Sequence, residues 1–136
     1  MERELTILLV EDNAADVYLV REALVATGVP NALHVVRDGV AAMEFLRQAV
    51  AGSEPPDLVI LDLNLPRKSG REVMAEIEAS PELRDLPVAV LSTSHFENEI
   101  GKEFPLLRST FAAKTPDFRE LVEILRRFRD FARASA

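Results

Sequence analysis

Short apolar runs alternate with longer segments of helical period along the chain. The runs are rich in Val, Ile and Leu, and they cover Leu5 to Val10, Ala32 to Val36, Leu58 to Leu61, Val88 to Leu91 and Thr110 to Ala113. A short, continuously apolar run is typical of a strand buried on both faces of a parallel sheet. The alternation therefore predicts five β-α units, an α/β fold with helices on both faces of the sheet.

Polar residues and glycines predict where the helical segments begin and end. Asn13 is a good N-cap for the first helix, Gly28 stops it, and Asp38 begins the turn into the second. Ser94 with Glu97 has the spacing of a capping box. The helix that follows contains a glycine and ends near a proline, so we expect it to be short, weakly stable and a candidate for the moving part.

The last helix begins after Pro116 and carries an apolar stripe wider than a core needs. Ile124 and Phe131 widen the stripe on one side. Its other members are Phe118, Leu121, Val122, Leu125, Phe128 and Ala132. We therefore expect a homodimer through the final helix region.

Length, charge and composition narrow the class of protein. The 136 residues fit one domain, residues 1–136, with no output module expected. The absence of cysteine excludes disulfides and thiolate chemistry, and the net charge of -7 argues against binding to nucleic acid. No apolar run is long enough to span a bilayer and no signal peptide is evident, so we expect a cytoplasmic protein.

Acidic residues directly follow two of the apolar runs. Glu11 and Asp12 follow the first, and Asp62 follows the third. If these two strands are neighbours, the three carboxylates converge within reach of one small cation at the carboxyl edge of the sheet. A divalent cation would offset their mutual repulsion, and ligation by oxygen alone favours Mg²⁺ or Mn²⁺. An Asp carboxylate can also accept a phosphoryl group, and we choose Asp62 for that role.

Two further strand ends supply groups that could hold phosphate oxygens. Ser92 follows the fourth apolar run and offers a hydroxyl donor, and Lys114 follows the fifth and offers a cation. Four of the five strands thus end in a side chain suited to phosphoryl chemistry.

These motifs, in this order, resemble the receiver domain of bacterial two-component response regulators, of the single-domain, chemotaxis-regulator-like kind. The motifs are Leu9-Val-Glu-Asp-Asn13, Leu61-Asp-Leu-Asn-Leu-Pro66 with Gly70, Leu91-Ser-Thr93 and Phe111-Ala-Ala-Lys114. The amino-acid sequence from Asp62 to Val73, together with that from Leu91 to His95, is similar to the sequences of the subgroup paired with phytochrome-type histidine kinases.

The resemblance implies a flavodoxin-like fold with strand order 2-1-3-4-5. It implies that Asp62 accepts a phosphoryl group from a histidine kinase. Glu11, Asp12 and Asp62, with the backbone carbonyl of Asn64, would hold Mg²⁺. The expected function is a switch rather than an enzyme, with at most self-phosphorylation from small phosphodonors and slow autodephosphorylation.

The resemblance also implies a switching mechanism. Ser92 would be the switch hydroxyl, Lys114 the phosphate contact and Phe111 the switch aromatic, and phosphorylation would change a surface that binds a downstream protein. Phe111 lacks the hydroxyl of the commoner tyrosine. The family usually has proline after its lysine, in a cis peptide, whereas Thr115 follows Lys114 here. Either the cis bond is kept, or Lys114 reaches the site from a trans backbone.

Two other functions stay open. A phosphorylation-independent adaptor could retain the fold with an inert acidic edge. An aspartyl-nucleophile phosphohydrolase would need an acid two residues after Asp62, where Asn64 stands.

Several further polar residues receive structural interpretations. His34 and His95 have no partner at triad or metal spacing, so we expect packing and solvent exposure. Asp57 is expected to cap a turn away from the reactive edge. Arg67 and Lys68 either steer a phosphodonor or lie on a solvated loop.

Overall fold

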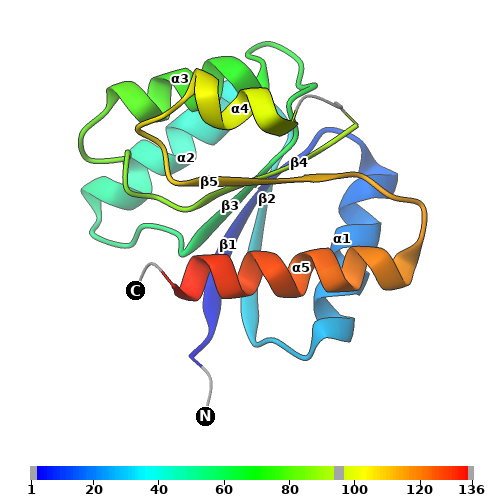
Figure 1. The fold of residues 1–136 in the computed structure, drawn as a ribbon. Coiled ribbons are helices and arrows are strands. Elements are labelled where there is room, and N and C mark those ends of the chain that lie inside the picture. The colour runs from blue at the N-terminus through cyan, green and yellow to red at the C-terminus, as the bar shows by residue number, and fades with distance from the viewer. Residues whose placement is uncertain (1–2, 94–96, 135–136) are drawn as a thin grey trace.

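The computed structural model describes residues 3–93 and 97–134, and its centre is one parallel sheet. The strands are β1 (Leu5–Val10), β2 (Asn31–Val36), β3 (Leu58–Leu61), β4 (Val88–Ser92) and β5 (Ser109–Ala113). All neighbouring pairs are parallel, in the order β2-β1-β3-β4-β5 (Figure 1). The flavodoxin-like order is confirmed, and each predicted strand lies within one residue of its observed bounds.

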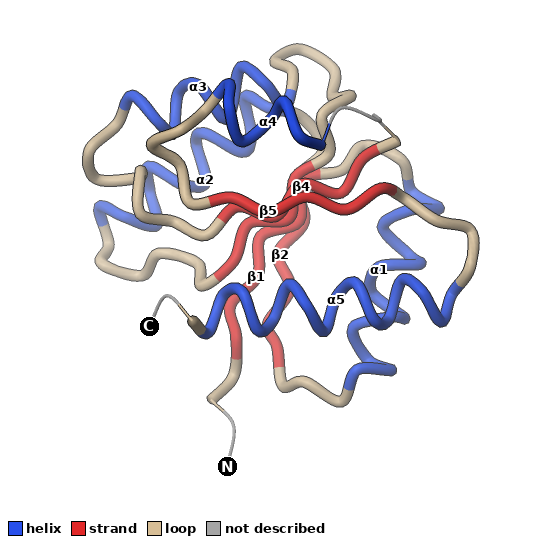
Figure 2. The backbone as a smooth tube through the Cα atoms, in the orientation of Figure 1, coloured by secondary structure: helices blue, strands red, loops and turns tan. Residues whose placement is uncertain are grey.

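Helices cover both faces of this sheet. They are α1 (Ala14–Thr27), α2 (Gly39–Ala51), α3 (Gly70–Ala79), α4 (Glu97–Glu103) and α5 (Phe118–Arg133). Figure 2 shows α1 and α5 on one face and α2, α3 and α4 on the other. In the part of the chain that the structure describes, no helix is long and apolar enough to cross a membrane.

Alternate residues of each central strand build two separate cores. In β1, Ile7 and Leu9 pack with α1 and α5, whereas Leu8 and Val10 pack with α2 and α3. Because successive side chains of a strand point to opposite faces, one apolar run serves both layers. The continuous apolar runs of the sequence follow from this double burial.

Side chains cap the first two helices: Asn13 was predicted as an N-cap, and Asp38, predicted only to begin the turn into the second helix, also caps it. The Asn13 side chain accepts a hydrogen bond from the backbone N–H of Asp16 at 3.0 Å, and Asp38 accepts one from Ala41 at 2.8 Å. Gly28 ends α1 with φ 75°, a left-handed conformation that favours glycine. As expected, α4 is short. Ser94 of the predicted capping box lies outside the described residues, as does His95.

The apolar stripe of α5 differs from its prediction at Phe118, Ile124 and Phe131. Phe118 is 42% exposed, because it is the first residue of the helix, ahead of the turn that packs on the sheet with Leu121. Ile124 is buried, and Phe131 packs against the same core beneath the Arg108 guanidinium, 4.9 Å from its ring centroid. The core therefore uses the two residues that were expected to widen the stripe for a partner.

Candidate functional site

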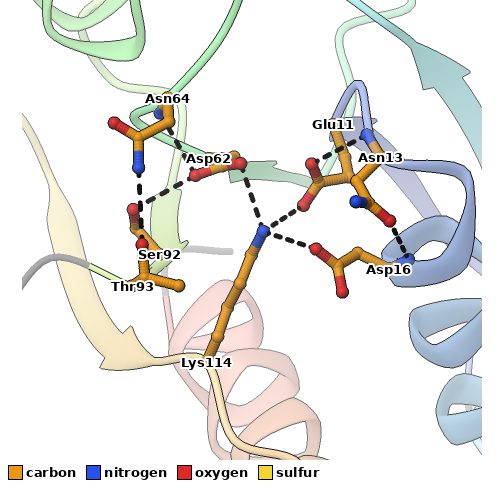
Figure 3. Close-up of polar contacts among 8 residues, drawn as sticks. All are labelled: Glu11, Asn13, Asp16, Asp62, Asn64, Ser92, Thr93 and Lys114. Carbon is orange, nitrogen blue, oxygen red and sulfur yellow. Dashed lines mark hydrogen bonds and ion pairs between the residues drawn. The ribbon is translucent and has the colours of Figure 1, made fainter.

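Strand pairing places the acidic residues side by side. In the β1–β3 register Val10 pairs with Leu61, so Glu11 and Asp62 are the next residues of adjacent strands. The Asp62 N–H donates to the Val10 carbonyl at 3.0 Å, and the Glu11 N–H donates to the Val36 carbonyl at 3.0 Å. Both carboxylates thus start from backbone that the sheet holds in place (Figure 3).

Three carboxylates form a group that fits a divalent cation. One oxygen from each of Glu11, Asp12 and Asp62 lies within 4.8 Å of the others. Oxygens bound to a common Mg²⁺ at roughly 2.1 Å lie at most about 4.2 Å apart, so a small adjustment completes the cluster. Asp12 is exposed and gives access from solvent, whereas Glu11 and Asp62 are buried.

Burial is the main influence on the pKa of Glu11. Desolvation raises the pKa of this carboxyl group, and the nearby negative charge of Asp62 acts in the same direction. Hydrogen bonds from the Lys114 ammonium and from the Asn13 N–H, at 3.2 Å, oppose the rise without cancelling it. A cation at this site would favour the ionised form of Glu11.

Lys114 reaches into the middle of the acidic groups from the end of β5. Its Nζ lies 2.6 Å from an oxygen of Glu11, 2.8 Å from one of Asp16 and 3.2 Å from one of Asp62. Burial acts to lower the pKa of Lys114, but the hydrogen bonds to Asp16 and Glu11 and the charges of Asp62 and Glu11 raise it above its ordinary value. The side chain is therefore a fixed positive charge at neutral pH.

Asp62 has a different kind of donor on each side. Its Oδ1 accepts from the Ser92 hydroxyl at 3.1 Å and from the backbone N–H of Asn64 at 3.2 Å. Its Oδ2 accepts from Lys114 Nζ. Ser92 is fully buried, so its hydroxyl has a fixed place beside the carboxylate.

The structure thus brings together Glu11, Asp12, Asp62, Ser92 and Lys114, all of which the sequence singled out. Phe111 lies apart from them, half-buried against the core beneath α2, α3 and α4. The Asn64 side chain donates to Thr93 Oγ1 at 3.4 Å.

Two polar partners were not predicted from the sequence: Thr93 and Asp16. Asp16 lies in the first turn of α1 rather than at the end of a strand, and no local pattern in the sequence singles it out.

The backbone after Lys114 takes the trans form. There is no cis peptide in residues 3–93 and 97–134, so the Lys114–Thr115 bond is trans. The Lys114 N–H donates to the Ser92 carbonyl at 2.9 Å, which continues the pairing of β5 with β4. Of the two alternatives, Lys114 reaches the acidic groups from a trans backbone.

The remaining polar residues have structural partners. His34 is exposed and packs against Phe45 with ring centroids 5.3 Å apart, as expected. Asp57 lies at the opposite edge of the sheet and accepts from the Thr6 N–H at 2.8 Å, so it ties β3 to β1 rather than capping a local turn.

Arg67 and Lys68, in the loop after β3, are both paired. Arg67 pairs with Asp38 at 3.4 Å and adopts φ 67°, and Lys68 pairs with Glu76. Both cations brace the loop against α2 and α3.

Comparison with known proteins gives a consistent match. The family model described as the response regulator receiver domain matches residues 7–126. The response regulator Rcp1 of Synechocystis sp. is 42% identical over 127 aligned residues, and the alignment covers 92% of this chain and 86% of Rcp1.

Solved structures agree in fold and in sequence. The phosphorylated cyanobacterial phytochrome response regulator RcpA is 42% identical, with a TM-score of 0.81 over 98% of this chain and 97% of RcpA. The Mn²⁺-bound form of Rcp1 is 41% identical, with a TM-score of 0.77 over 93% of each chain.

Proposed function

This chain belongs to the response regulator receiver family, and on that premise we propose that it accepts a phosphoryl group from a histidine kinase on Asp62. The observation that carries the proposal is the set of donors around Asp62: a buried hydroxyl, a backbone N–H and an ammonium group. The chain is homologous to phytochrome response regulators. We propose a phytochrome-type kinase as its partner.

The proposed reaction needs little from the protein beyond position and charge. An oxygen of Asp62 attacks the phosphorus of phosphohistidine, a P–O bond forms, and the P–N bond breaks as imidazole leaves. Ser92 and Lys114, which donate to the two oxygens of Asp62, would donate to the phosphoryl oxygens after transfer. Glu11, Asp12, Asp62 and the backbone carbonyl of Asn64 would hold Mg²⁺. The bound ion would neutralise negative charge on the phosphoryl group.

Asp62 suits the acceptor role better than its two acidic neighbours. Glu11 accepts from Lys114 and from the Asn13 N–H, but no hydroxyl donates to it in the residues that the structure describes. Asp12 is exposed. Asp62 alone has both the hydroxyl and the ammonium group that an acyl phosphate would use.

Phosphorylation would act as a switch through the same two groups. Ser92 ends β4 and Lys114 follows β5, so a shift of either toward the phosphate would move the loops ahead of α4 and α5. Phe111 packs beside Ile100 of α4 and would change its rotamer with that movement. The output is a surface for a downstream protein, and the family generally acts as a phosphoacceptor switch rather than as a classical enzyme.

The proposal also covers the oligomeric state of the protein and its location in the cell. Residues 1–136 would act as one receiver domain, in the cytoplasm, beside the phosphohistidine of its kinase. A homodimer would form through the α5 region, where Phe118 leaves apolar surface exposed. Light scattering at high concentration tests the dimer, and a monomeric mass would count against it.

The structure favours neither of the two alternatives. A phosphohydrolase would need a proton donor at Asn64, whose amide instead donates to Thr93. An inert adaptor would not require three hydrogen-bond donors around the Asp62 carboxylate.

Intact mass after incubation with acetyl phosphate and Mg²⁺ tests the proposal. One phosphoryl group should appear on the wild type and none on Asp62→Asn, which keeps the shape of the side chain but replaces the acceptor oxygen. An equal adduct on both proteins would contradict the assignment of Asp62. No adduct on either, with rapid quenching, would favour the inert adaptor.

A further inference from the structure

Asp16 is a third partner of Lys114 and belongs to a different element from the other two. It lies in the first turn of α1, where Asn13 caps its backbone N–H. Its Oδ2 is 2.8 Å from Lys114 Nζ, so this bond ties the start of α1 to the end of β5. In Figure 3 Asp16 and Glu11 reach the ammonium group from one side and Asp62 reaches it from the other.

The other two partners of Lys114 have a competing use. Glu11 and Asp62 belong to the carboxylate group that fits a divalent cation, and Asp16 does not. An ammonium group and a divalent cation repel each other, so they cannot share the same carboxylate oxygens closely. Cation binding therefore weakens the contacts of Lys114 with Glu11 and Asp62.

We propose that Asp16 is a positioning residue that holds the Lys114 ammonium at the site when a divalent cation engages Glu11 and Asp62. An ammonium group has three N–H donors, and the structure gives each a carboxylate partner. With Asp16 retained, one donor stays anchored to α1 and the other two become free for phosphoryl oxygens. This inference rests on the proposed function.

Asp16 also makes it easier for Lys114 to leave the other carboxylates. Without Asp16, the ammonium would have only Glu11 and Asp62 as partners, and it would compete with the cation for both. Replacing Asp16 should therefore weaken cation binding although Asp16 is not a ligand. A carboxylate that acted only through its distant charge would weaken binding whether or not Lys114 is present.

A double-mutant cycle on Mg²⁺ affinity separates these two effects. Calorimetric titration would compare the wild type, Asp16→Asn, Lys114→Met and the double variant. Asp16→Asn should weaken Mg²⁺ binding about three- to fivefold, as expected for loss of a half-exposed ion pair. Lys114→Met should strengthen it, and the effect of Asp16→Asn should largely disappear in the Lys114→Met background.

Two control variants complete the experiment. Glu22→Gln removes an exposed charge from the same helix and should leave Mg²⁺ affinity unchanged, and Asp16→Glu should restore much of it. Equal weakening by Asp16→Asn in both backgrounds, or no weakening in either, would overturn the inference. If the wild type bound no Mg²⁺ and formed no phosphoryl adduct, the proposed function would fail instead, and the inference with it.

Discussion

The site is organised around one positive charge and the carboxylates that surround it. Lys114 contacts Glu11, Asp16 and Asp62, which come from three different parts of the chain. Its charge offsets much of the repulsion that would otherwise raise the free energy of the folded state. A divalent cation can take over that task, which leaves Lys114 available for a phosphoryl group.

Asp12 offers a clean test of the metal site at the residue scale. The side chain is exposed, so Asp12→Ala should leave the melting temperature without metal unchanged or slightly raised, because one repelling charge is lost. Millimolar Mg²⁺ stabilises a protein that binds it only when folded, and that increase in melting temperature should vanish in the variant. Asp85→Ala, at another exposed acid, should keep the full increase. An increase retained by Asp12→Ala would mean that the ion binds elsewhere.

The residues of the site were predictable to the extent that they end strands. Glu11, Asp62, Ser92 and Lys114 all follow or end apolar runs, and parallel strands bring such residues to one edge. Asp16 follows no strand. Its role depends on the rotation of α1 about its axis and on the reach of Lys114, and neither is encoded in a local pattern.

At the scale of elements, close backbone contact fixes the loop that follows Asp62. A Cβ at Gly70 would lie 2.4 Å from the carbonyl oxygen of Asp62, so Gly70→Ala must displace backbone next to the acceptor. We expect a loss of about 1–3 kcal/mol in the free energy of unfolding, the usual cost of overpacking, together with slower labelling by acetyl phosphate.

Gly101 is the matched control for this substitution. It lies in α4, where a Cβ would meet nothing within 4 Å. Gly101→Ala should stabilise the protein by up to about 1 kcal/mol, since alanine is the better helix former. Denaturant unfolding measures both variants, and equal stability of Gly70→Ala and the wild type would contradict the proposed contact.

Glu76 connects three elements and gives a pH dependence with a defined sign. It pairs with Lys68 of the loop after β3 and with Arg47 of α2 at 3.2 Å. The hydrogen bond from Lys68 lowers the pKa of Glu76 in the folded protein, with Arg47 acting in the same direction. Its stabilising contribution is therefore present above the ordinary glutamate pKa of about 4.3 and is lost as the pH falls through the lower folded value.

Glu76→Gln should accordingly cost about 0.5–1 kcal/mol at pH 7, within the range for partly exposed ion pairs. The difference from the wild type should shrink as the solution is acidified below the lowered pKa. Urea unfolding at several pH values, with Glu44→Gln as an exposed control on α2, measures it. A cost that does not change with pH would show that the ion pairs are not its source.

The central strands β1, β3 and β4 were predictable because burial on both faces gives a parallel strand a continuous apolar run. The half-buried edge strands β2 and β5 kept enough apolar residues to be found as well. Helix ends were predictable where a side chain caps them, as at Asn13 and Asp38. Phe118 and Ile124 were assigned to the wrong environments. Helical period reports which residues share a face, but not how far along its axis the helix stays in contact with the sheet.

At the scale of the whole molecule, the two cores and the reactive edge have separate roles: the cores hold the sheet in place, and the edge carries the polar site. The core beneath α1 and α5 and the core beneath α2, α3 and α4 hold the strands at fixed spacing. The acidic site lies at one edge of the sheet, and the Arg3–Asp57 pair lies at the other. Chemistry at one edge can therefore bias loops and α4 without disturbing the cores.

Trapping the acyl phosphate shows directly which residue is phosphorylated. Borohydride reduction of an aspartyl phosphate converts that residue to homoserine, which peptide mass spectrometry can locate. After treatment with acetyl phosphate and Mg²⁺, we expect homoserine at position 62 and no reduced side chain at any other acidic residue. Homoserine at Asp12, 5-hydroxynorvaline (the product from a glutamyl phosphate) at Glu11, or a phosphoryl group that resists borohydride would contradict the assignment.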